Sequence, residues 1–166
     1  MNYHNITKDD MLNGEGLRVV LWVAGCEHHC DECQNPITWN PDGGIYFDNA
    51  AYDELMTALE PDYISGVTFS GGDPLHPRIY PKVAKLCHDI KERFPDKTVW
   101  VYTGYEWEKI NHLRTFLQWV DVIVDGPFVK ELKDVKYHWA GSTNQRVIDV
   151  QKSLEVGEVI LHEKIS

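Results

Sequence analysis

The chain has 166 residues, of which 43% are hydrophobic, and it carries a formal net charge of −10. This size suits one domain with its own core, and the acidic excess without a Lys- or Arg-rich run argues against nucleic-acid binding through phosphates. The sequence starts without a signal-peptide pattern and has no window near the roughly eighteen apolar residues of a membrane span, so we expect a cytoplasmic protein with no membrane contact.

Short β-rich runs alternate along the chain with longer stretches of helical period. Apolar runs predict strands at residues 18–25, 65–70, 97–103 and 120–125. Several of them are apolar on both faces, which is typical of a parallel sheet covered by helices. We therefore expect an α/β domain built on a parallel sheet or barrel.

Apolar residues at helical spacing predict three helices between these strands. They cover residues 49–59, 77–94 and about 106–118, and each has an apolar face that can pack on the sheet. Cys87 lies beside the apolar stripe of the second helix, so we expect it to be a small core residue.

The end of the chain gives a weaker signal. The run RVIDV at residues 146–150 predicts one more strand, whereas residues 151–166 fit either a closing strand around EVILH or a loose tail. We expect one domain over residues 1–150 and an extension over residues 151–166.

Unusual residues directly follow each of the first four predicted strands. Because the carboxyl ends of parallel strands share one edge, where such folds bind ligands, we expect these residues to meet there. They are Cys26, then Ser70, Gly71, Gly72 and Asp73, then Thr103, and finally Asp125 with Gly126.

Three cysteines, Cys26, Cys30 and Cys33, form a C-x3-C-x2-C run. Thiolates at this spacing on a loop can reach one metal centre together, and three soft ligands suit iron–sulfur or zinc. A 4Fe–4S cluster held by three cysteines leaves one iron open for a cofactor. The alternatives are a structural zinc site completed by His28 or His29, or reduced thiols without metal.

This cysteine run after the first strand resembles the signature of the radical S-adenosylmethionine superfamily. Further residues resemble the family of activating proteins of anaerobic ribonucleoside-triphosphate reductases, from the start of the chain to about residue 150. One departure is Gln34, which stands where an aromatic commonly follows the third cysteine. The matching residues are Asn13-Gly14, Gly16, Arg18, Asn35, Thr38-Trp39, Ser70 to Leu75, Trp100, Thr103 to Tyr105, Val124 to Gly126, Gly141-Ser142 and Asn144-Gln145.

The resemblance implies an incomplete (β/α) barrel with parallel strands and an open top. It also implies that Cys26, Cys30 and Cys33 hold a 4Fe–4S cluster, which cleaves S-adenosyl-L-methionine reductively to methionine and a 5′-deoxyadenosyl radical. The radical would take a hydrogen atom from a glycine of the reductase large subunit, with an electron donor such as flavodoxin.

The same resemblance suggests roles for the residues at the strand ends. The segment from Ser70 to Asp73 resembles the glycine-rich element that receives the methionine amino group, although Gly-Gly-Asp-Pro is also ordinary turn chemistry. Thr103 and Asp125 lie where relatives bind the ribose and methionine parts of the cofactor. Asp125 is equally consistent with a cation-binding carboxylate and with a turn residue.

Two polar segments have roles that the sequence leaves open. Residues 13–16 precede the first predicted strand, and the resemblance suggests that they close the site or touch the partner. Residues 141–146 either line the substrate face or form a solvated loop.

Two other functions also remain open. One is a different radical enzyme of the same superfamily, such as another glycyl-radical activase or a small-molecule enzyme. The other is a non-enzymatic adaptor that uses the cysteine loop as a zinc-binding staple.

Overall fold

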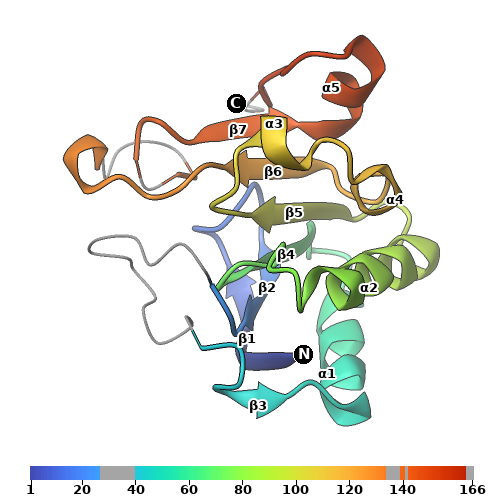
Figure 1. Cartoon of the computed structure of the whole chain (residues 1–166). Coiled ribbons are helices and arrows are strands. Elements are labelled where there is room, and N and C mark those ends of the chain that lie inside the picture. Colours follow the sequence, from blue (N-terminus) through green and yellow to red (C-terminus); the bar gives the residue numbers. More distant parts are fainter. Residues whose placement is uncertain (27–39, 134–138, 141, 164–166) are drawn as a thin grey trace.

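A mixed sheet of seven strands that does not close on itself forms the centre of the computed structural model (Figure 1). The structure describes residues 1–26, 40–133, 139–140 and 142–163. The strand order is β3-β1-β2-β4-β5-β6-β7. The strands are β1 (Asn2–Asp10), β2 (Arg18–Val23), β3 (Ile45–Tyr46), β4 (Gly66–Gly71), β5 (Thr98–Tyr102), β6 (Val122–Asp125) and β7 (Arg146–Asp149).

The four central strands, β2, β4, β5 and β6, are parallel to one another. Each overlaps one of the four strands predicted from apolar runs, so the parallel α/β centre is confirmed. The residues of β2, β4 and β6 are almost all buried, because side chains cover both faces of these strands.

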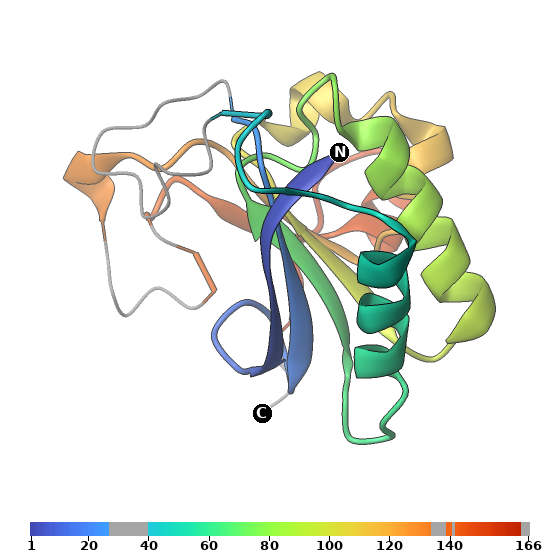
Figure 2. The same cartoon turned by 90° about the horizontal axis from the view of Figure 1, so that it is seen from below.

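Helices cover one face of this sheet (Figure 2), and the connections between parallel strands supply them. Helix α1 (Asn49–Leu59) has the predicted bounds and is capped by Asp48, whose side chain accepts a hydrogen bond from the Ala51 amide. Helix α2 (Tyr80–Arg93) lies within the predicted range 77–94. Cys87 of α2 is fully buried in the core, as predicted.

The prediction of one continuous helix at about residues 106–118 is wrong. The structure has two short helices, α3 (Trp107–Ile110) and α4 (Arg114–Leu117), separated by a turn. The turn occurs at Leu113, whose backbone angles (φ −78°, ψ 57°) are not helical. Apolar periodicity continues across the turn because both helices pack buried side chains on the same core, which is why the pattern concealed the break.

The margins of the sheet differ from the centre and were largely not predicted. Strand β1 pairs antiparallel with β2 and with β3, and neither β1 nor β3 was expected. Strand β7, predicted at 146–150, pairs antiparallel with β6. Residues 150–156 form a helix, α5 (Val150–Val156), which neither alternative for the chain end included.

Of the closing strand around EVILH, one of the two alternatives for the chain end, the described residues form only an isolated bridge between Leu161 and Ile148. A short 3₁₀ helix, η2, covers Lys130–Leu132. Within the described residues, every helix is too short or too polar to cross a membrane.

Candidate functional site

The carboxyl edge of the parallel strands brings together the described residues that the sequence placed there. Cys26 follows β2 and is partly exposed, and the residue before it, Gly25, accepts a hydrogen bond of 2.6 Å from the Asp73 amide after β4. Thr103 follows β5, and its hydroxyl donates to the Asp73 carboxylate at 2.8 Å. Cys30 and Cys33 lie outside the described residues.

The glycine pair after β4 allows the backbones of two strands to come unusually close. A Cβ atom on Gly71, which has φ +102°, would lie 2.7 Å from the Val23 carbonyl oxygen. A Cβ atom on Gly72 would lie 2.4 Å from the Gly25 carbonyl oxygen, and the Gly72 amide donates to Val23 at 2.8 Å. The glycines therefore fit the backbone immediately before Cys26, a contact that the sequence did not reveal.

The buried carboxylate of Asp73 joins the loop after β4 to the loop after β5. Asp73 is only 1% exposed. Its oxygens accept hydrogen bonds from the Leu75 amide at 2.9 Å, from the Thr103 hydroxyl and from the Gly104 amide at 2.9 Å. These hydrogen bonds hold the buried carboxylate in place, so Asp73 acts here as a fixed brace between the two loops.

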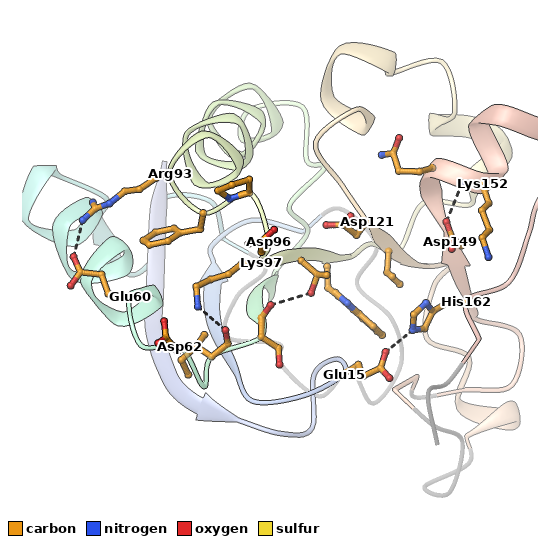
Figure 3. Close-up of a pocket in the computed structure, with 18 residues that line it drawn as sticks. Glu15, Glu60, Asp62, Arg93, Asp96, Lys97, Asp121, Asp149, Lys152 and His162 are labelled. Carbon is orange, nitrogen blue, oxygen red and sulfur yellow. Dashed lines mark hydrogen bonds and ion pairs between the residues drawn. The ribbon is translucent and has the colours of Figure 1, made fainter.

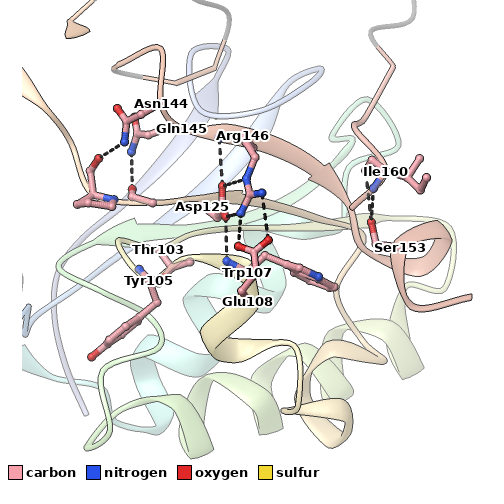
Figure 4. Close-up of polar contacts among 12 residues, drawn as sticks. Thr103, Tyr105, Trp107, Glu108, Asp125, Asn144, Gln145, Arg146, Ser153 and Ile160 are labelled. Atoms are coloured by element: carbon pink, nitrogen blue, oxygen red, sulfur yellow. Dashed lines mark hydrogen bonds and ion pairs between the residues drawn. The ribbon is translucent and has the colours of Figure 1, made fainter. Parts of the chain in front are cut away.

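Asp125, at the end of β6, is also 1% exposed and is paired with Arg146 of β7 (Figure 4). The Asp125 carboxylate accepts from the Trp107 amide at 2.8 Å and from the Arg146 amide at 3.1 Å. The guanidinium of Arg146 also binds Glu108 at 2.7 Å, and the hydrogen bonds that it donates to Asp125 and Glu108 raise the pKa of Arg146. In this structure the cation beside Asp125 is therefore the Arg146 guanidinium.

The polar segment after residue 141 folds back onto the loop that follows β6. The Gln145 side chain donates to the Gly126 carbonyl at 2.9 Å, and the Asn144 side chain donates to the Pro127 carbonyl at 2.9 Å (Figure 4). These contacts place residues 142–145 beside the carboxyl edge, which favours the site-lining interpretation over a freely solvated loop.

The face of the sheet opposite α1 and α2 contains a buried arginine that sequence reasoning noted only as a family match. Arg18 is 0% exposed, and burial lowers its pKa to about 10. Its guanidinium donates to both oxygens of Thr98, to Thr68 Oγ1 and to the carbonyls of Val67 and Glu15. The sequence signal for this buried hydrogen-bonding arginine was its position at the start of an apolar strand.

The loop at residues 13–16 packs against this same face. Thr68 Oγ1 donates to the Asn13 carbonyl at 2.6 Å. Gly14 has φ +123°, and a Cβ atom there would lie 2.7 Å from Arg18 Cδ and 3.1 Å from the Trp100 ring. The loop is therefore fixed on the sheet, and a glycine is required where it passes over Arg18 and Trp100.

Two further polar side chains lie on the central strands near this edge. Ser70 is 9% exposed and is aligned with Trp22 of β2. The Tyr102 hydroxyl is buried and has no hydrogen-bond partner among the described residues. Burial raises the pKa of Tyr102, so the phenol remains a neutral donor at physiological pH.

A groove of about 1050 Å³ lies at the other end of the strands (Figure 3). Its lining includes Ser65, Thr98 and Val122, which are at or just before the amino ends of β4, β5 and β6. The groove is thus at the edge opposite Cys26, so its size does not make it the site of the cysteine chemistry.

Comparisons with known proteins agree with the resemblance inferred from the residues. A family described as "4Fe-4S single cluster domain" matches residues 12–148. An anaerobic ribonucleoside-triphosphate reductase-activating protein of Enterobacteria phage T4 is 45% identical over 147 residues, covering 89% of this chain and 93% of that protein. Proteins with the same name from Escherichia coli K12 and Haemophilus influenzae are 41% and 38% identical, covering 89% and 87% of this chain and 97% and 96% of their own lengths.

Proposed function

Because the chain belongs to the family of anaerobic ribonucleoside-triphosphate reductase-activating proteins and has a 4Fe-4S single cluster domain, we propose that it places a glycyl radical on such a reductase. The observation that carries the proposal is the carboxyl edge of the sheet. There the segment that ends at Cys26 lies against the glycine pair Gly71 and Gly72, and Asp73 joins the ends of β4 and β5. The relatives of the chain are named for this activation.

The donor set fits the cluster that the family description names. Cys26, Cys30 and Cys33 would supply three thiolates, and soft thiolate ligands suit iron–sulfur clusters. Cys26 lies at the edge where the strand ends converge. When bound, a 4Fe–4S cluster provides one electron for cleaving S-adenosyl-L-methionine to methionine and a 5′-deoxyadenosyl radical.

The residues of the edge would bind and orient S-adenosyl-L-methionine. We assign Ser70, Gly71 and Gly72 to its methionine part, because they lie at the carboxyl end of β4 against the backbone that precedes Cys26, and both glycines are partly exposed. Asp73 and Thr103 would keep the neighbouring loops in place through their shared hydrogen bonds. Asp125 would act with Arg146 as a neutralised pair beside the cofactor.

The open sheet supports a protein substrate rather than an enclosed small molecule. We infer that it is an incomplete (β/α) barrel of the radical S-adenosylmethionine type, with its helix-free side available to the reductase large subunit. The reductase glycine would lose one Cα hydrogen atom to the 5′ carbon, giving 5′-deoxyadenosine and a glycyl radical. A partner segment that enters the site would also exclude water from the radical.

The proposal further requires a one-electron donor such as flavodoxin and a reducing compartment. Cluster-binding thiolates must stay reduced, and the cytoplasm keeps thiols reduced. We therefore place the reaction in the cytoplasm.

The test is anaerobic activation of the cognate reductase. The reconstituted protein, a one-electron reductant and S-adenosyl-L-methionine should yield one 5′-deoxyadenosine per glycyl radical, seen as a doublet in electron paramagnetic resonance. Replacing the reductase's glycine by alanine should remove the doublet. Cofactor cleavage without any radical on the reductase would reject the named substrate while leaving the cofactor chemistry intact.

A further inference from the structure

The segment after α5 returns to the sheet and pairs with its last strand. Helix α5 ends at Gly157, which is left-handed (φ +84°). The Asp149 amide then donates to the Ile160 carbonyl at 2.8 Å, and the His162 amide donates to the Val147 carbonyl at 2.8 Å. This pairing covers the outer edge of β7 and fixes His162 at the margin of the sheet. The segment lies beyond residue 148, where the family match ends.

The side chain of His162 contacts three residues that are distant from one another in sequence. Its Nε2 atom lies 2.9 Å from the Glu15 carboxylate (Figure 3). Its ring centroid lies 5.2 Å from that of Trp100 and 5.8 Å from that of Trp139. The side chains of His162 and Glu15 are only 17% and 28% exposed, so solvent screens their interaction less than it screens an ordinary surface pair.

Through Glu15, His162 is linked to a loop on the sheet face opposite α1 and α2, and by its contact with Trp139 to a residue that shortly precedes residues 142–145. Glu15 belongs to the loop at residues 13–16, whose carbonyl groups accept hydrogen bonds from Thr68 and Arg18. Trp139, which has the unusual φ of +64°, precedes residues 142–145 beside the carboxyl edge. A left-handed tryptophan is costly, so its packing against Trp100 and His162 must hold it there.

From these contacts we propose that His162 is a positioning residue for the reductase. It holds the loop at residues 13–16 and the Trp139 side chain in one fixed arrangement before the partner arrives. Ordering the loop at residues 13–16 and Trp139 in advance lowers the entropy cost of association, so the expected consequence is tighter binding of the reductase. This inference rests on the proposed function, because it names the surface that receives the substrate protein.

The experiment compares His162→Ala with His162→Gln in the reconstituted full chain. His162→Ala should raise the half-saturating reductase concentration on the order of tenfold, the scale expected when a charge-assisted hydrogen bond that orders a binding loop is lost. The rate at saturating reductase and the iron content should change less than twofold. His162→Gln keeps a donor for Glu15 and should recover most of the affinity, and His112→Ala removes an exposed histidine away from the site as the control.

A second readout needs neither cofactor nor reductase. Amide hydrogen exchange at residues 13–16 should become faster in His162→Ala, although these residues are more than a hundred positions away in sequence. Combining Glu15→Ala with His162→Ala should add little to either single change, because both remove the same contact.

The positioning role would be overturned by unchanged reductase affinity in His162→Ala, by no recovery in His162→Gln, or by additive effects in the double variant. If the parent protein formed no glycyl radical on its reductase, the proposed function would fail instead. The hydrogen-exchange comparison would still test the contact between His162 and the loop.

Discussion

The parallel centre and the antiparallel margins of the sheet hold their neighbours in different ways. At the carboxyl edge of the centre, backbone meets backbone, as where Gly72 approaches Gly25. At the margins, side chains join the two ends of the chain, as where His162 binds Glu15. The centre therefore fixes atoms closely beside the cysteine segment, whereas the margins fix loops that border the open side.

This difference separates the expected consequences of mutation. Changes to the cysteines or to the close backbone contacts of the centre should cost cluster binding or folding, because there is no free space around those backbone contacts. Changes at the margins should cost less stability and act mainly on the reductase. Four predictions test this division, beginning with the largest expected effect.

Loss of any cluster cysteine should abolish stable iron binding. Each of Cys26→Ala, Cys30→Ala and Cys33→Ala leaves two thiolates, too few to retain the cluster. Cys87→Ala is the matched control, because Cys87 is fully buried in the core and burial raises the pKa of its thiol. The measurement is the amount of iron and sulfide per chain after anaerobic reconstitution. A full complement of iron in Cys30→Ala would contradict the assignment of Cys30 as a ligand.

Gly72→Val should strongly destabilise the centre. The new Cβ would lie 2.4 Å from the Gly25 oxygen, so we expect a loss of about 3 kcal/mol or more in the free energy of unfolding, with reduced iron retention as well. Gly157→Ala tests a margin glycine with φ +84° and nothing within 4 Å of its Cβ. Backbone strain alone should lower the free energy of unfolding of Gly157→Ala by about 1 kcal/mol.

Urea unfolding of both variants measures the difference. Equal losses for the two glycine variants would remove the distinction between the centre and the margin. A Gly72→Val protein that kept its stability and its iron would show that the β4 turn can move away from Gly25.

The same division explains how far the sequence alone could lead. Strands β2, β4, β5 and β6 were predictable because burial on both faces leaves continuous apolar runs. The convergence of Cys26, Asp73, Thr103 and Asp125 on one edge followed from that topology.

Apart from β7, which the run RVIDV predicted, the margins could not be predicted because their structure comes from pairing rather than from local pattern. Of the nine residues of β1 only Ile6 is buried, so the strand carries little apolar periodicity and depends on its pairing with β2. The pairing of Asp125 with Arg146 also requires β7 to lie antiparallel beside β6, which no local signal specifies. The ligand roles of Cys30 and Cys33 stay predictions.

The ion pair between Asp125 of β6 and Arg146 of β7 lies where the parallel centre meets the antiparallel margin, so its removal tests how strongly the two are joined. Asp125→Asn should lower the free energy of unfolding by about 2 kcal/mol, because it leaves the partly buried Arg146 guanidinium without its buried counter-charge. Glu108→Gln is the control, since the Glu108 side chain is 57% exposed and its pair with Arg146 should be worth roughly 0.5 kcal/mol.

Thermal or urea unfolding of both variants gives the comparison. If Asp125→Asn lowered the free energy of unfolding as little as Glu108→Gln, the ion pair between Asp125 and Arg146 would not stabilise the fold. The carboxylate would then be better explained as a binding group for another cation.

The smallest expected effect comes from Tyr102, on a central strand but on the helix-free face. Its hydroxyl is buried without a partner among the described residues, and an unsatisfied buried hydroxyl costs free energy that phenylalanine would not. Tyr102→Phe should therefore raise the free energy of unfolding by about 1 kcal/mol, measured on protein without cluster or cofactor.

The matched control is Tyr52→Phe, because the Tyr52 hydroxyl donates to Asp89 at 3.1 Å and its removal should lower stability slightly. A loss of stability in Tyr102→Phe would mean that the hydroxyl is satisfied in the folded protein. A gain in stability together with weaker binding of S-adenosyl-L-methionine or of the reductase would instead show that the centre keeps an unpaired donor for a ligand.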